Sequence, residues 1–166
     1  MCGVIGVIYK NTEATGLASV GSDLIKMLES LEHRGRDSTG ITIGGVENKS
    51  DYIVRFRIEG QNSNALEMLS KGISSIGAVI EYSGFANGFG KICVNYEADV
   101  GKLANTIADI DGVEVDSIGT NSEIVKDVGD ATELNDHHAI GEIKGTHGIG
   151  HVRMATESKI DVSHSH

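Results

Sequence analysis

The residues of this 166-residue sequence that could perform chemistry begin at Cys2, next to the amino terminus. Removal of Met1, which a small second residue permits, would leave Cys2 with a free α-amino group beside its thiol. These two types of group titrate close together in short peptides, so one residue would supply both a nucleophile and a proton acceptor. Gly3 would leave room for a substrate to approach. The alternative is a Met-Cys start without functional meaning.

Two further segments carry charged side chains among glycines. Arg34, Arg36 and Asp37 lie in a polar turn around Gly35, for which the alternative interpretation is a solvated connection between a helix and a strand. Arg153 lies in a glycine-rich segment, where its planar guanidinium could bind a carboxylate through two parallel hydrogen bonds. A structural salt bridge is the alternative for Arg153.

The other potential ligands predict neither a metal nor a cofactor. His137 adjoins His138, and His164 and His166 lie near the end of the sequence. A zinc site needs three or four converging ligands, and adjacent histidines on a helix are not expected to face one ion, so we interpret them as exposed loop residues. The glycine spacings match neither a dinucleotide fingerprint nor a P-loop. Cys93, in an alternating strand pattern, is interpreted as a buried core thiol.

Composition excludes several classes of partner. The chain has 24 acidic and 14 basic residues, a formal net charge of −10, and only 4% aromatic residues. Nucleic acids and anionic membranes are therefore not expected to be its main partners. No apolar run approaches the roughly 20 residues needed to span a bilayer, and the start does not have the pattern of a signal peptide, so we expect a cytoplasmic protein.

The elements that must position these residues follow from hydrophobic periodicity. Both ends of the chain contribute strands, and a helix with an N-cap at Ser22–Asp23 extends to about Glu32. Residues 119–141 are acidic and are interpreted as a loop with a short helix. The predicted strands of these two ends are 4–9, 39–43 and 148–155, the last packed tightly enough to require glycine.

The middle of the chain has a pattern of its own. Its order β-α-β-β-α-β over about 52–119 is typical of a ferredoxin-like fold. Asn87-Gly88 is interpreted as a hairpin turn. The predicted strands are 52–58, 76–82, 91–96 and 113–118, and the predicted helices are 64–69 and 100–110. We therefore predict an α+β protein with an inserted subdomain at 51–119.

Three segments, taken in order, resemble the glutaminase domain of class II glutamine amidotransferases, which are N-terminal-nucleophile (Ntn) hydrolases. They are MCGVIGV at 1–7, LEHRGRDSTGI at 31–41 and GIGHVRMAT at 148–156. The variant Arg153–Ser158, with Ser117–Gly119 and Lys126–Gly129 upstream, looks most like the glutaminase subunits of glutamate synthase-type and N-methylglutamate synthase-type enzymes.

This resemblance implies an αββα four-layer sandwich, formed by 1–50 and 120–166, with a ferredoxin-like βαββαβ insertion at 51–119 and no cofactor. It implies that Cys2 attacks glutamine to form a γ-glutamyl thioester, and that the ammonia released passes to a synthase partner. Arg153 would hold the substrate α-carboxylate. Met154, Thr156 and Glu157 would line the pocket, and Gly3, Arg34, Gly35, Asp37 and His151 would support the site.

The sequence also departs from the family pattern. Many members have Trp and His where this chain has Met154 and Glu157. The family's oxyanion-hole Asn-Gly follows the arginine-containing strand, so we expect these 166 residues to be the N-terminal part of a longer glutaminase domain. The alternative is one part of a split glutaminase domain. The alternative function is a non-catalytic regulatory or ligand-binding subunit that retains the fold, with 51–119 as a docking module.

Overall fold

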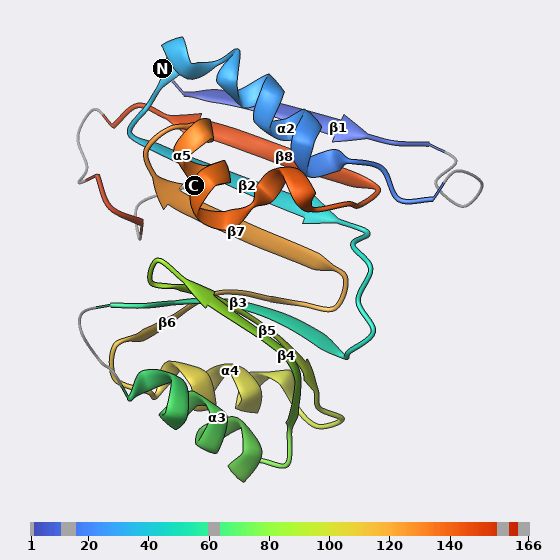
Figure 1. Cartoon of the computed structure of the whole chain (residues 1–166), viewed down its shortest axis with the longest axis vertical. Helices are drawn as coiled ribbons and strands as arrows, with labels where there is room; N and C mark the ends of the chain where they lie inside the picture. Colours follow the sequence, from blue (N-terminus) through green and yellow to red (C-terminus); the bar gives the residue numbers. More distant parts are fainter. Residues whose placement is uncertain (1, 11–15, 60–63, 156–159, 163–166) are drawn as a thin grey trace. The chain divides into compact units, whose positions relative to one another are not determined.

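The computed structural model of the chain describes residues 2–10, 16–59, 64–155 and 160–162. The chain divides into two compact units: unit 1 comprises 1–47 and 124–166, and unit 2 comprises 48–123. Each unit contains a four-stranded sheet with helices on one face (Figure 1). The architecture is therefore α+β. The four-layer sandwich and the ferredoxin-like insertion at 51–119 stay predictions.

Unit 1 is built around the strand that carries Arg153. Strand β8 lies between β1 and β2 and is antiparallel to both, in the sheet order β1-β8-β2-β7. The elements of this unit are β1 (Gly3–Ile8), α2 (Val20–Glu29), η1 (Glu32–Arg34), β2 (Ser38–Gly44), β7 (Ser122–Val128), α5 (Ala131–His138), η2 (Ile140–Glu142) and β8 (His147–Arg153).

Glycines let helix α2 pack closely on β8. A Cβ atom at Gly150 would lie 2.9 Å from Cδ1 of both Ile5 and Leu28, and one at Gly148 would lie 2.8 Å from Cδ1 of Leu24. Leu24 and Leu28 are fully buried. The prediction that this strand requires glycine for tight packing is confirmed.

The predicted N-cap of this helix is wrong. Helix α2 begins at Val20, and the side chain of Asp23 accepts a hydrogen bond from the Tyr9 hydroxyl instead of capping the helix. Gly21 permits the earlier start, because a Cβ atom there would collide with the carbonyl group of Ile140. The Gly21 N–H also donates to the carbonyl of Ile143 at 3.0 Å, which fixes the first turn against η2.

Unit 2 has the predicted element order. Its sheet is antiparallel in the order β4-β5-β3-β6, and α3 and α4 cover one face (Figure 1). Asn87 and Gly88 have φ angles of 54° and 85° and form the β4–β5 turn, so the hairpin prediction is confirmed. The elements are β3 (Tyr52–Ile58), α3 (Ala65–Ser75), β4 (Val79–Ala86), β5 (Phe89–Asn95), α4 (Val100–Ala108) and β6 (Val113–Gly119).

The two faces of this sheet differ. The helix-covered face forms an apolar core that includes Phe56, Ile92 and Ile107. The boundary between the units falls within β7, and Glu123 is the last residue of unit 2. On the other face of the unit 2 sheet, its buried carboxylate pairs with Arg55 and with Lys91, each at 2.6 Å. Cys93 is half-buried beside these charges, so its interpretation as a core thiol is wrong.

Strand β7 is the element that the sequence analysis missed, since 119–141 was interpreted as a loop with a short helix. The predicted short helix is α5. The buried positions of β7 are Glu123, Val125 and Asp127, whereas Ile124 and Val128 are exposed. At all of these positions except Val125, the polar residue is buried and the apolar residue is exposed, which is the inverse of the usual pattern. None of the described helices is long and apolar enough to cross a membrane.

Candidate functional site

The register of the unit 1 sheet brings the candidate residues of the two chain ends together. Gly3 pairs with Val152, and a continuation of this antiparallel register by one residue would set Cys2 opposite Arg153. Ser38 pairs with Arg153 on the other side of β8. Since side chains alternate along a strand, Cys2, Arg153 and Ser38 form one row on the face opposite α2. We call these three residues the terminal row.

The members of the terminal row differ in their exposure. Cys2 is exposed, as a nucleophile must be, whereas Arg153 is 4% exposed and Ser38 is fully buried. Ser38 Oγ has no hydrogen-bond partner among the described residues. The next row along the same face contains Val4, His151 and Gly40, so half-buried His151 is one step from the terminal row.

The 34–37 turn packs directly against the end of β8. A Cβ atom at Gly35 would lie 2.5 Å from both the carbonyl oxygen of Arg153 and the amide nitrogen of Met154, so only glycine fits. The Asp37 N–H donates to the carbonyl of Arg153 at 3.1 Å. The Asp37 carboxylate accepts from the Ala155 N–H at 2.6 Å. Asp37 therefore holds the backbone on both sides of Met154.

The other supporting residues have packing contacts. Gly3 is buried, and a Cβ atom there would lie 3.1 Å from Leu31 Cδ1 and 3.4 Å from the Cβ of Arg34. The space beside the Gly3 Cα is thus filled by protein, and the predicted role of Gly3 in letting substrate approach Cys2 stays a prediction. Arg36 is exposed and pairs with Glu32 at 2.7 Å, as expected for a solvated turn.

Comparisons with known proteins agree with the kind of chemistry that this arrangement allows. A protein of Methanothermobacter thermautotrophicus described as "Putative glutamine amidotransferase" is 35% identical over 175 residues, which cover 100% of this chain and 56% of that protein. The glutamine amidotransferase-like protein GlxB of Rhizobium meliloti is 28% identical over 176 residues, covering 100% of this chain and 54% of GlxB.

Over its whole length, this chain is similar to proteins described as glutamine amidotransferases or glutamine amidotransferase-like. A glutamine–fructose-6-phosphate aminotransferase (isomerizing) of Buchnera aphidicola is also 34% identical over 79 residues, which are 48% of this chain and 11% of that protein. No family model matches the sequence. The chain spans about half the length of the two relatives that it matches throughout.

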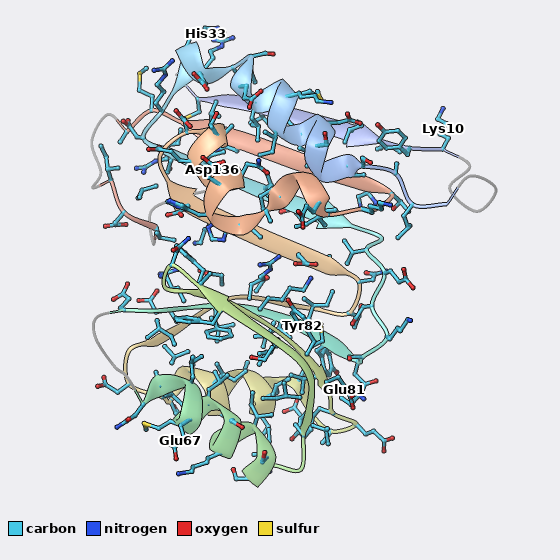
Figure 2. The ribbon with its side chains drawn as sticks, viewed as in Figure 1. Lys10, His33, Glu67, Glu81, Tyr82 and Asp136 are labelled. Carbon is cyan, nitrogen blue, oxygen red and sulfur yellow. The ribbon has the colours of Figure 1, made fainter. Side chains whose placement is uncertain are left out.

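The predicted pocket residues of this glutamine amidotransferase-like chain are placed only in part. Met154 follows Arg153 and is 42% exposed, beside the terminal row. Thr156 and Glu157 lie outside the described residues, so their predicted roles stay predictions. His33 lies in η1 and is exposed (Figure 2).

Sequence reasoning missed two features of this site. Ser38 follows Asp37 directly, and the pairing of the two strands would have identified it as the neighbour of Arg153. The sequence predicts His137 and His138 as exposed loop residues, and the His137 side chain is exposed as expected. Both residues lie in the last turn of α5 and not in a loop, the His138 side chain is buried, and both rings contact the buried carboxylate of Asp127. Among the described residues, no group of three or more His, Cys, Asp or Glu could hold a metal ion.

Proposed function

We propose that this chain is the glutaminase part of a class II glutamine amidotransferase, in which Cys2 becomes the N-terminal nucleophile after Met1 is removed. The terminal row carries this proposal. An exposed thiol and a nearly buried guanidinium come from opposite ends of the sequence, and the Gly3–Val152 pair next to both of them supports a placement side by side. A nucleophile beside an α-carboxylate clamp is the arrangement that glutamine hydrolysis needs.

The chemistry starts at the substrate carboxamide. The Cys2 sulfur forms a bond to the carboxamide carbon, and the C–N bond breaks so that the nitrogen leaves as ammonia. The α-amino group of Cys2 accepts the thiol proton and passes it to the leaving nitrogen. Water then attacks the γ-glutamyl thioester, which releases glutamate and restores the thiol.

Arg153 would select glutamine by its α-carboxylate. Its guanidinium can donate two parallel charge-assisted hydrogen bonds, a geometry that lysine does not reproduce. Because Arg153 is almost entirely buried, the carboxylate would meet it with little competition from water. The γ-carboxamide of the same glutamine would then extend toward exposed Cys2.

The 34–37 turn supports this proposal because it holds the backbone of Arg153, a member of the terminal row, in place. Gly35 touches the backbone of Arg153 and Met154, and Asp37 binds Arg153 and Ala155 through backbone atoms. These contacts fix the backbone from which the Arg153 side chain extends. We therefore assign Gly35 and Asp37 a positioning role and His151 a place beside the row, and the predicted supporting role of Arg34 stays a prediction.

Hydroxylamine trapping tests the proposed chemistry in the full-length protein. With glutamine and hydroxylamine present, the thioester should transfer its acyl group to give γ-glutamyl hydroxamate, which forms a coloured ferric complex. Cys2→Ser should give none, and Cys93→Ser should give the normal amount. Folded protein that yields no hydroxamate would favour the alternative, a regulatory or ligand-binding subunit.

The ammonia acceptor belongs to this proposal as well. A glutaminase of this type supplies ammonia to a synthase subunit or domain, as the resemblance to glutamate synthase-type and N-methylglutamate synthase-type subunits implies. Copurification with such a synthase, together with glutamine-dependent amination of its substrate, would support the assignment. Hydrolysis of glutamine that no partner stimulates would limit the function to a glutaminase.

A further inference from the structure

A buried side-chain cluster lies in unit 1, where β7 is followed by α5. The Asp127 side chain is 5% exposed, and its Oδ2 lies 3.0 Å from His137 Nδ1 and 3.2 Å from His138 Nε2. The His138 side chain is 3% exposed and the His137 side chain 45% exposed. We refer to Asp127, His137 and His138 as the His-Asp clasp.

Two neighbouring histidines reach one oxygen because they use different ring nitrogens. Successive residues on a helix are about 100° apart, so equivalent atoms of the two rings point in different directions. His137 uses Nδ1, close to the backbone, and His138 uses Nε2, at the far end of the ring. Both residues lie in the last turn of α5, where the helix dipole favours positive charge.

The clasp keeps a carboxylate ionised in a buried position. Burial by itself would raise the pKa of Asp127, but hydrogen bonds from His138, His137 and the Val128 N–H, with the charge of His138, hold the pKa below its ordinary value. An ionised Asp127 accepts from both rings at once. The end of β7 is thereby tied to the end of α5.

Gly129 connects the His-Asp clasp to the 34–37 turn through backbone hydrogen bonds. Its φ of 97° lies in the left-handed region, and a Cβ atom there would collide with the Glu133 carboxylate. The Gly129 N–H donates to the carbonyl of Asp37 at 3.0 Å, and its carbonyl accepts from the Thr39 hydroxyl at 2.9 Å. Both polar backbone groups of Gly129 are thus bound to the segment around Asp37.

The segment after Gly129 is fixed as well. Asp130 caps α5: its Oδ1 accepts from the N–H groups of Thr132 and Glu133 at 3.0 and 3.1 Å, and the Glu133 carboxylate accepts from the Asp130 N–H at 3.0 Å. Gly129 therefore lies between two anchored residues, Asp127 before it and Asp130 after it. A shift of Asp127 would reach Asp37 through Gly129.

We propose that the His-Asp clasp is a positioning cluster for glutamine binding: it fixes Gly129, and through Gly129 it fixes the Asp37 turn that holds the backbone around Arg153. This inference rests on the proposed function, because it assigns the clasp to the α-carboxylate end of the same site. The clasp touches no substrate. It acts on glutamine affinity and leaves the reaction of Cys2 unchanged.

Calorimetric titration of glutamine into the full-length Cys2→Ser protein tests the clasp, since this variant binds substrate without turnover. His138→Ala in this background should weaken binding on the order of tenfold, less than the roughly 100-fold that a full 1 Å misplacement can cause. His138→Gln places an amide N–H near the position of Nε2 and should restore affinity. His137→Ala removes the more exposed donor and should weaken binding less.

Asp136→Asn is the matched control, because Asp136 is an exposed carboxylate on α5 (Figure 2). It should leave affinity unchanged.

Unaltered glutamine affinity in both His138→Ala and His137→Ala, with lowered melting temperatures, would show a purely structural role and overturn the proposal. Arg153→Lys in the same background separates the two ideas. If Arg153→Lys weakens binding and the clasp variants do not, the clasp proposal alone fails; if Arg153→Lys has no effect, the proposed function fails.

Discussion

The two units share one plan, a four-stranded sheet with helices on one face, but they use the other face differently. In unit 2, the charged groups of that face bind one another: Arg55 and Lys91 pair with Glu123, and Arg57 pairs with Glu114 and Asp116. In unit 1, the same face ends in the terminal row, where an exposed thiol adjoins an almost buried guanidinium.

This difference separates structural charge from candidate functional charge. A carboxylate placed between two cations is satisfied within the fold, and its groups are poorly placed to bind a ligand. The Arg153 backbone, by contrast, is fixed by Gly35 and Asp37 at the end of a strand, next to Cys2. Under the proposed function, the chemistry belongs to unit 1, whereas the charges on the open face of unit 2 stabilise the fold.

The largest expected effect separates the two cysteines. Cys2→Ser in the full-length protein should remove essentially all glutamine hydrolysis, because a hydroxyl is far less ionised and less nucleophilic than a thiol at neutral pH. Cys93→Ser should leave hydrolysis intact, because the pKa of the Cys93 thiol is raised and the thiol is therefore a poor nucleophile. Burial is the main cause of the raised pKa; the charge of Glu123 raises it further, and the charges of Lys91 and Arg55 lower it. Ammonia release is the measurement. A loss of activity in Cys93→Ser would contradict the assignment of chemistry to unit 1.

The next effect compares the two cores. Ile107→Ala in unit 2 and Leu24→Ala in unit 1 each remove a fully buried side chain and should cost about 2–5 kcal/mol of unfolding free energy. Only Leu24→Ala should also raise the KM for glutamine, because Leu24 packs against Gly148 on the strand that carries Arg153. Denaturant unfolding and steady-state kinetics measure these effects. An equal rise in KM for both variants would remove the distinction between the units.

The helices and strands could be predicted where hydrophobic spacing followed burial. β3, α4 and β6 begin at the predicted residues because their apolar side chains face the core. β7 could not be predicted in this way, since its buried side carries Glu123 and Asp127. Glu123 is paired with Arg55 and Lys91, which are distant in sequence, and Asp127 is bound by two histidines of the following helix. Hydropathy reveals neither set of contacts.

The candidate site was predictable in its residue types and not in its geometry. Cys2, Arg153 and the 34–37 turn could be selected from the motifs, but their adjacency depends on the register of β8 with β1 and β2. The role of Gly35 follows from its contact with Arg153 and Met154, which lie more than a hundred residues away.

A smaller effect tests Arg153 directly. Arg153→Lys should raise the KM for glutamine and lower kcat/KM roughly ten- to a hundredfold, since a lost charge-assisted contact is worth about 1.5–3 kcal/mol. Unfolding should change little, because the positive charge stays. The structural salt-bridge interpretation expects the opposite pattern, a lower melting temperature with a normal KM, and both quantities can be measured on one variant.

The smallest effect is the pH dependence of stability. Because the pKa of Asp127 is lowered in the folded state, its ionised form stabilises the fold above the unfolded-state pKa of about 4, and this contribution is lost as pH falls through the folded value. Asp127→Asn should therefore be less stable than wild type near neutral pH, and the difference should shrink below about pH 4. Denaturant unfolding across this pH range measures it, and a difference that grows in acid would contradict the assigned cause.

Mass spectrometry of the full-length protein after treatment with a glutamine-mimicking diazo-ketone tests the central claim most directly. The amino-terminal peptide should begin at Cys2, without Met1, and should carry one covalent adduct on the Cys2 sulfur. Free glutamine should slow the labelling, because it occupies the same site beside Arg153. An amino terminus that retains Met1, or an adduct found mainly on Cys93, would contradict the account.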